Sequence, residues 1–232
     1  MAINAGDTTY YQAKRGIVQD GLVLNLDAAV DASYPGNGTT WYDLAGSNSG
    51  TLTNGPTFDR DNGGSIVFDG SDDYIIQTSA INTSSTAYTV CGWFKRDTGS
   101  TGTIASYRAS IAVLYQLDTN GPVPRMVVRD DSGNIASVSA TTTIANGTWF
   151  FVVGVRDGNS IYVYVNGVQE NSGSATFGSF SITDMPKIGA LVYGASSSQF
   201  MDGNIQNVCI YNRVLTAAEV LKNYNATKGR FE

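Results

Sequence analysis

TWFFVVGVRDGNSIYVYVNG, at residues 148–167, contains two β-type segments joined and closed by Asp-Gly and Asn-Gly. Such dipeptides are typical of tight hairpin turns, because both residues tolerate positive φ. In the second segment, 160–165, isoleucine and valine alternate with Tyr162 and Tyr164. A strand with this alternation turns its aliphatic side chains to a core and its tyrosines to an aromatic surface.

The same pattern recurs along the chain, which contains ten Asn-Gly or Asp-Gly dipeptides between short β-type segments. These runs do not alternate with amphipathic helical segments, so a parallel sheet is not expected. The pattern predicts an all-β fold, an antiparallel two-sheet sandwich. The further predicted strands are 22–26, 65–68, 74–77, 88–95, 112–117, 125–129, 135–139, 187–191 and 204–211.

One short C-terminal helix is predicted after Thr216, because Thr216 and Glu219 have the spacing of a capping box. Val220, Leu221 and Tyr224 then form an apolar stripe for docking on the sandwich. Residues 21–232 are expected to be one domain. Residues 1–20 contain only scattered apolar residues, which indicates either an arm ordered by a partner or a disordered end.

Composition excludes several functions. Among 232 residues, 14 Lys and Arg face 20 Asp and Glu, and no basic run could follow a phosphate backbone, so nucleic acid is not an expected partner. Histidine is absent, which removes the commonest general base and metal ligand. Only three of the acids are Glu, and they are widely separated, so no glycosidase-type pair is visible. No signal peptide or transmembrane segment is recognised.

The only two cysteines, Cys91 and Cys209, lie inside apolar strand-like runs. Two buried free thiols are the first interpretation. A disulfide between paired strands is the alternative.

Several motifs together resemble the laminin G-like, concanavalin A-like jelly-roll family. They are GLVLNLDA at 21–28, TTWYDLAGSNSGTLTNGPTF at 39–58, IVFDGSDDYI at 66–75, the hairpin at 147–167 and GNIQNVCIYNRVLTAAEV at 203–220. The resemblance covers nearly the whole chain from Gly21 and implies a jelly-roll sandwich. The family includes lectins, enzyme-appended modules, adhesion domains and virion proteins.

Within that family, TTWYDLAG, GTLTNGPTF and the C-terminal YNATKGRF are similar to versions in structural proteins of tailed bacteriophages, particularly cyanophages. The resemblance implies a non-catalytic virion surface protein, as a capsid decoration or a fibre or tail component. Other virion proteins, a host-surface glycan and a homotrimeric assembly are then the expected partners. The alternative is a bacterial carbohydrate-binding module, free or linked to an enzyme.

The resemblance also implies a structural calcium site, with Asp27, Asp43 and Asp202 as candidate ligands. Gln206 and Asn207 stand where relatives often have an acidic pair, which weakens any ion bound there. The alternative is that Asp27, Asp69, Asp157 and Asp202 are ordinary turn residues that accept hydrogen bonds from their own backbone. The paired acids Asp72 and Asp73 are expected to point to opposite sides, so they should not share a proton.

A sugar site would use a flat aromatic ring with polar groups from rim loops. The candidates are the aromatic residues in or beside loop-like segments: Trp41, Tyr42, Tyr74, Tyr107 and Tyr193. Each could also be structural, because such rings fill cores and contacts. Catalysis is not expected, because no Glu has an acidic neighbour at the spacing that jelly-roll glucanases use.

Overall fold

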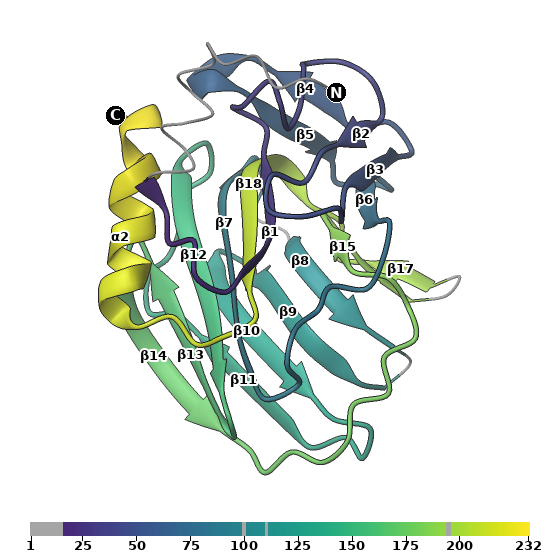
Figure 1. Cartoon of the computed structure of the whole chain (residues 1–232), viewed down its shortest axis with the longest axis vertical. Helices are drawn as coiled ribbons and strands as arrows, with labels where there is room; N and C mark the ends of the chain where they lie inside the picture. The colour runs from purple at the N-terminus through teal and green to yellow at the C-terminus, as the bar shows by residue number, and fades with distance from the viewer. Residues whose placement is uncertain (1–15, 99–100, 110, 194–195) are drawn as a thin grey trace.

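The computed structural model describes residues 16–98, 101–109, 111–193 and 196–232, mostly as antiparallel strands (Figure 1). The predicted hairpin forms from β12 (Trp149–Asp157) and β13 (Ser160–Val165), which pair from Val152 opposite Val165 to Asp157 opposite Ser160. Gly158 in its turn has a φ of 58°, as a tight hairpin turn requires. The aliphatic side chains of β13 are at most 3% exposed, which confirms the predicted alternation.

Within the described residues, two eight-stranded sheets form a sandwich, which confirms the predicted fold class. In the first sheet, sheet A, the order is β14 (Val168–Ser174), β13, β12, β7 (Ala87–Arg96), β18 (Asp202–Tyr211), β5 (Ser65–Asp69) and β4 (Thr57–Asp59). Strand β1 (Leu22–Asp27) pairs with the second half of β18, while β5 pairs with its first half.

The second sheet, sheet B, has the order β11 (Ile135–Ser139), β10 (Val123–Arg129), β9 (Val113–Asn120), β8 (Thr103–Arg108), β15 (Lys187–Ile188), β6 (Tyr74–Gln77), β3 (Gly50–Thr53) and β2 (Thr40–Trp41). A separate hairpin consists of β16 (Leu191–Tyr193) and β17 (Ser196–Ser198). Two short 3-10 turns, η1 (Asp61–Gly63) and η2 (Lys228–Arg230), complete the described elements.

The central strands of sheet A, β12, β7 and β18, are buried on both faces. Val152 belongs to the core between the sheets, whereas Val153, its neighbour on β12, belongs to a second cluster under helix α2 (Ala217–Thr227). Burial on both sides explains why the sequence at 148–155 is continuously apolar. It also corrects the expected aromatic surface: Tyr162 stays partly exposed, but Tyr164 is buried in the second cluster.

Helix α2 begins with the predicted capping box, in which the Thr216 hydroxyl accepts from the Glu219 amide and the Glu219 carboxylate accepts from the Thr216 amide. The predicted docking stripe was partly wrong. Val220 is buried, but Leu221 is 44% exposed. The buried face instead continues through Asn223 and Thr227, polar residues that hydrogen-bond within the second cluster.

The packed chain begins earlier than predicted. Ile17 and Val18 are 5% and 6% exposed and belong to the second cluster. The Val18 amide donates to the Asn223 side chain, and the Tyr211 hydroxyl donates to the Val18 carbonyl. The predicted boundary at Gly21 is therefore too late, since residues 16–20 belong to the domain. The rest of the predicted arm, 1–15, lies outside the described residues.

Candidate functional site

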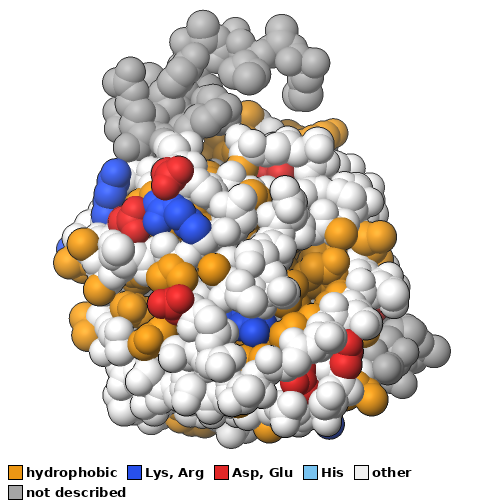
Figure 2. Space-filling view, turned by 60° about the horizontal axis from the view of Figure 1, so that its bottom comes forward, with side chains coloured by type: hydrophobic (Ala, Val, Ile, Leu, Met, Phe, Trp, Pro, Cys, Tyr) orange, Lys and Arg blue, Asp and Glu red, His pale blue; other side chains and the backbone are white. Residues whose placement is uncertain are grey.

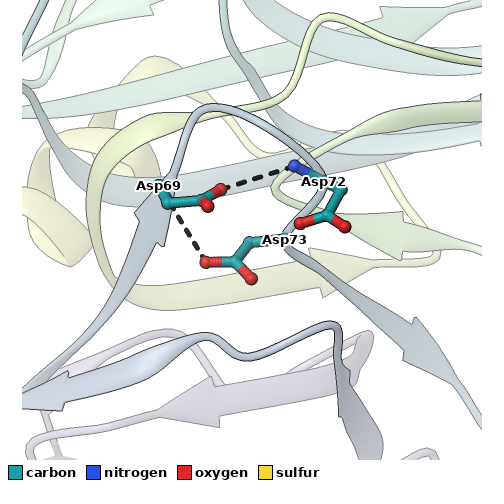
Figure 3. A group of neighbouring side chains, drawn as sticks. All are labelled: Asp69, Asp72 and Asp73. Carbon is teal, nitrogen blue, oxygen red and sulfur yellow. Dashed lines mark hydrogen bonds between the residues drawn. The ribbon is translucent and has the colours of Figure 1, made fainter.

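Three acidic side chains converge at the turn between β5 and β6 (Figure 3). Carboxylate oxygens of Asp69, Asp72 and Asp73 lie within 4.8 Å of one another. The prediction that Asp72 and Asp73 point to opposite sides is therefore wrong, because the turn brings their carboxylates together although Asp72 is exposed and Asp73 is only 4% exposed. We call these three residues the acidic turn.

Hydrogen bonds hold the acidic turn in shape. Asp69 Oδ1 accepts from the amides of Ser71 (2.8 Å) and Asp72 (3.4 Å), and Asp73 Oδ2 accepts from the Asp69 amide (3.1 Å). The Ser71 amide is the main reason that the pKa of Asp69 is lowered. Burial, reinforced by the charges of Asp69 and Asp72, raises the pKa of Asp73. An all-oxygen donor set of this kind suits a hard cation such as calcium.

The predicted calcium ligands do not come together in one site. Asp202 lies beside the acidic turn, because it pairs with Asp69 across β18 and β5. Asp27 pairs with Asn207, five residues further along β18, which places it roughly 16 Å away at the strand's rise per residue.

Asp27 and Asp43 instead have structural partners. Asp27 forms a two-pronged ion pair with Arg230 at 2.9 Å for both contacts, and its Oδ1 also accepts from the Ala29 amide. Asp43 accepts from three backbone amides, those of Asn25, Ala45 and Asn48. The alternative prediction describes Asp27 in part, because Asp27 accepts from the backbone of its own turn and is also paired with Arg230.

The five candidate aromatic residues are dispersed. Trp41 is fully buried and Tyr107 is 7% exposed, so neither offers a ring to a sugar. Tyr42 is 42% exposed, and Tyr74 is partly exposed next to the acidic turn. Tyr193 lies on β16, and its side chain is outside the described part of the structure.

The outer face of sheet B carries ordered polar side chains, most of which are buried: Ser106, Gln116, Asp118 and Lys187 are each at most 5% exposed. On β10, Met126 and Val128 enter the core, so Arg125, Val127 and Arg129 point outward. One row in register runs across the whole outer face, consisting of Thr51, Ile76, Lys187, Ser106, Gln116, Val127 and Ser137. Figure 2 shows the molecule turned toward its lower end, where backbone and side chains that are neither charged nor hydrophobic predominate around several hydrophobic patches.

Four side chains of this outer face form what we call the outer network. Arg125 donates to both oxygens of Asp118, at 2.9 and 2.6 Å. The Gln116 amide donates to Asp118 and, at 2.8 Å, to Gln199. Burial raises the pKa of Asp118, while Arg125 opposes that rise. The sequence did not reveal this network, because Gln116 and Arg125 lie in predicted strands without a polar alternation and Asp118 lies just beyond the predicted strand at 112–117.

A family model described as the concanavalin A-like lectin/glucanases superfamily matches residues 69–221, more than half of the chain. The chain belongs to this superfamily. The matched region starts at the acidic turn and ends in α2, so it includes the outer network and most of both sheets.

Solved structures show the superfamily fold in larger proteins. The crystal structure of the botulinum neurotoxin serotype D binding domain has a TM-score of 0.69 and 14% identity, covering 90% of this chain and 52% of the toxin chain. The binding domain of Paraclostridial Mosquitocidal Protein 1 has a TM-score of 0.67 and 16% identity, with the same coverage. The serotype D ligand-binding domain in complex with N-acetylneuraminic acid has a TM-score of 0.66 and 14% identity, covering 92% and 52%.

This superfamily member spans about half the length of those toxin domains. The likeness therefore establishes the fold, and it does not locate the sugar on the matched half. No curated protein matches the chain. Among the described residues, none of the helices has the length and apolar character to cross a membrane.

Two of the three glutamates have structural partners in this superfamily member. Glu170 accepts hydrogen bonds from the amides and hydroxyls of Thr141 and Thr142. Glu219 caps α2 and pairs with Arg213 at 2.6 Å. Both carboxylates are thus engaged in contacts that hold loops and the start of α2 in place.

Proposed function

We propose that the chain is a non-catalytic glycan-binding domain that uses the outer face of sheet B. The observation that carries this proposal is the partly exposed ring of Tyr74 on that face, with Thr51 and Thr53 of the neighbouring strand β3 and the acidic turn beside it. Sugar sites combine a few fixed polar groups with an aromatic ring. In the outer network, Arg125 and Gln199 remain partly exposed and are held by hydrogen bonds to the buried Asp118 and Gln116, so binding orders few side chains.

Tyr74 brings the ring and the acidic turn together. It directly follows Asp73 and pairs with Thr53 on β3, whose neighbour Asn54 donates to the Asp72 carbonyl at 2.9 Å. Asp69, Asp72 and Asp73 would hold calcium, which would stiffen this turn and offer a charge to sugar hydroxyls. The cation is thus assigned to the acidic turn in place of the set containing Asp27 and Asp43.

The test is a glycan array of neutral and acidic oligosaccharides, followed by titration of the best ligand. We expect Tyr74→Ala to bind about tenfold more weakly, and Tyr74→Phe to retain most of the affinity, because the ring stacks on the sugar. Tyr42→Ala is the matched control, since it removes another exposed tyrosine away from the acidic turn.

Equal affinity of Tyr74→Ala and wild type would contradict the proposed site. Absence of binding to any glycan on the array would contradict the function. Repeating the titration with a calcium chelator tests the cation separately, because an unchanged affinity and unfolding temperature would rule out a role for calcium.

We further propose that the domain is displayed on a virion surface as a capsid decoration or as part of a fibre or tail, as a homotrimer, with residues 1–15 as its anchor to other virion proteins. The phage-like motifs at 39–58 and 224–231 support this assignment. If the protein binds glycan but does not attach to virus particles, the result would instead favour a bacterial carbohydrate-binding module, free or linked to an enzyme.

A further inference from the structure

The two cysteines face each other in the centre of sheet A. Cys91 on β7 and Cys209 on β18 are directly opposite in the antiparallel register of these neighbouring strands. They are 1% and 2% exposed, and both lie in the second cluster under α2. Directly opposed residues carry their side chains on the same face, so the two thiols are neighbours.

Both thiols are free and hydrogen-bonded. The Cys91 thiol donates to the Cys209 carbonyl at 3.5 Å, and the Cys209 thiol donates to the Asn25 side chain at 3.3 Å. Asn207 donates to the Cys209 sulfur at 3.8 Å. The neighbouring Cys91 thiol, together with burial, raises the pKa of Cys209 well above its ordinary value, so the folded protein keeps this thiol protonated.

The backbone geometry suits a covalent bond between them. Directly opposed Cα atoms in an antiparallel pair lie about 4.5 or 5.5 Å apart. Disulfides span Cα separations of about 4.4 to 6.8 Å, so no rearrangement of the sheet is needed. The register shift between Ile205 and Asn207 lies two residues before Cys209 on β18. Because such an irregularity interrupts the hydrogen-bond ladder, the strand can adjust locally as the two sulfurs come into bonding distance.

We propose that Cys91 and Cys209 form a modification site at which a low-molecular-weight disulfide produces an intrachain disulfide between β7 and β18. One cysteine, as thiolate, attacks the small disulfide, forms a mixed disulfide and releases one small thiol. The other cysteine then attacks the mixed disulfide and releases the second small thiol. Two thiol protons leave the protein, and its two electrons reduce the small disulfide to two thiols.

Access to this site depends on the chain that covers it. Phe231 packs against Trp93 and Trp149, with ring centroids 4.2 and 4.8 Å apart. The Trp93 indole donates to Thr227 at the end of α2 at 2.7 Å. The oxidant reaches the thiols only when this C-terminal cover opens, so the reaction in the wild-type protein is slow.

The test incubates the full chain with oxidised glutathione and follows the free thiols under denaturing conditions, the intact mass and the unfolding temperature. We expect loss of both thiols, a mass decrease of two hydrogens, a peptide that links Cys91 to Cys209, and an unfolding temperature about 5 to 10 °C higher. A reductant should reverse all four changes. Phe231→Ala should be oxidised faster than wild type.

The double variant Cys91→Ala/Cys209→Ala is the matched control and should show no change in mass or unfolding temperature. Two outcomes would overturn the proposal. One is a stable glutathione adduct on either cysteine without the internal bridge. The other is persistence of both free thiols in Phe231→Ala after prolonged oxidation, because the cover should open more often in that variant.

Discussion

The ion pair between Asp27 and Arg230 joins β1 to the C-terminal η2 turn. The Asp27 side chain is 3% exposed and that of Arg230 is 19% exposed. Removing Arg230 would leave a buried carboxylate without its counter-ion. We expect Arg230→Ala to lower the free energy of unfolding by about 3 kcal/mol, measured by urea denaturation.

Arg60→Ala is the matched control for this change, since exposed Arg60 lies over the Phe58 ring at 5.8 Å and should contribute less than about 1 kcal/mol. Adding Asp27→Asn to Arg230→Ala should recover part of the loss. Equal effects of the two arginine variants would show that the buried pair adds no net stability.

The burial of several single residues could not be predicted from the local sequence. Trp41 and Tyr107 stand in or beside loop-like segments, yet both are buried in the core. Arg156 ends a strand beside a turn, where sequence alone indicates solvent, but it is 1% exposed between the rings of Phe177 and Phe180, each 4.5 Å away. Remote segments determine the burial of these residues, so local composition could not reveal it.

At the scale of the element, the cap of α2 makes stability depend on pH. The hydrogen bond from Arg213 is the main cause that lowers the pKa of Glu219 to about 2 from its ordinary 4.5. A lowered pKa in the folded state means that ionised Glu219 contributes stability above pH 4.5 and that this contribution is lost as pH falls toward 2. We expect Glu219→Gln to cost about 1 kcal/mol at pH 7.

The difference in unfolding free energy between wild type and Glu219→Gln should shrink between pH 4.5 and pH 2, as followed by urea denaturation. Glu232→Gln is the matched control, because its 65% exposed side chain reaches only Lys228, at 3.6 Å. A difference that stays constant over this range would contradict the assignment of the pH dependence to Glu219.

Elements defined by neighbouring residues were predictable. The turn at 157–158, the alternation of β13 and the capping box at 216–219 each depend on contacts within a few residues. The docking face of α2 was only half predicted. Leu221 points outward while Asn223 is buried, since Asn223 hydrogen-bonds to Val18 and Tyr211 from distant parts of the chain. No apolar periodicity marks a polar residue of this kind.

At the scale of the whole molecule, the chain ahead of β1 divides into two parts. Ile17 and Val18 fill the second cluster, so removing residues 1–18 should lower the unfolding free energy by about 3 kcal/mol. Removing residues 1–15 should change it by less than about 0.5 kcal/mol. Thermal unfolding of the two truncated chains checks this difference, and equal stability would contradict the packing role of Ile17 and Val18.

The same pair of truncations separates anchoring from folding. If the chain is a virion protein, the version without residues 1–15 should keep its unfolding temperature and lose incorporation into particles. Light scattering should then show whether the proposed homotrimer also depends on this segment. Unchanged incorporation and assembly would remove the anchor from the proposal.

The sequence allowed the fold class to be predicted, but it did not allow prediction of which strands pair with each other. Antiparallel sheets follow from short strands and frequent turns, but nothing local indicates that β5 pairs with β18, more than 130 residues later. The acidic turn was visible as a motif at 69–73, whereas the outer network needed the register of β9 and β10 to bring Asp118 beside Arg125. Binding surfaces built across strands depend on that register.

The place of β18 in sheet A has a consequence for biosynthesis. This strand lies between β7 and β5 and also pairs with β1, yet residues 202–211 are translated after all three of these strands. A nascent chain therefore presents β7 with one unpaired edge and an uncovered apolar face until residues 202–211 have left the ribosome. Chains that stop before β18 should be the ones that chaperones retain and proteases remove.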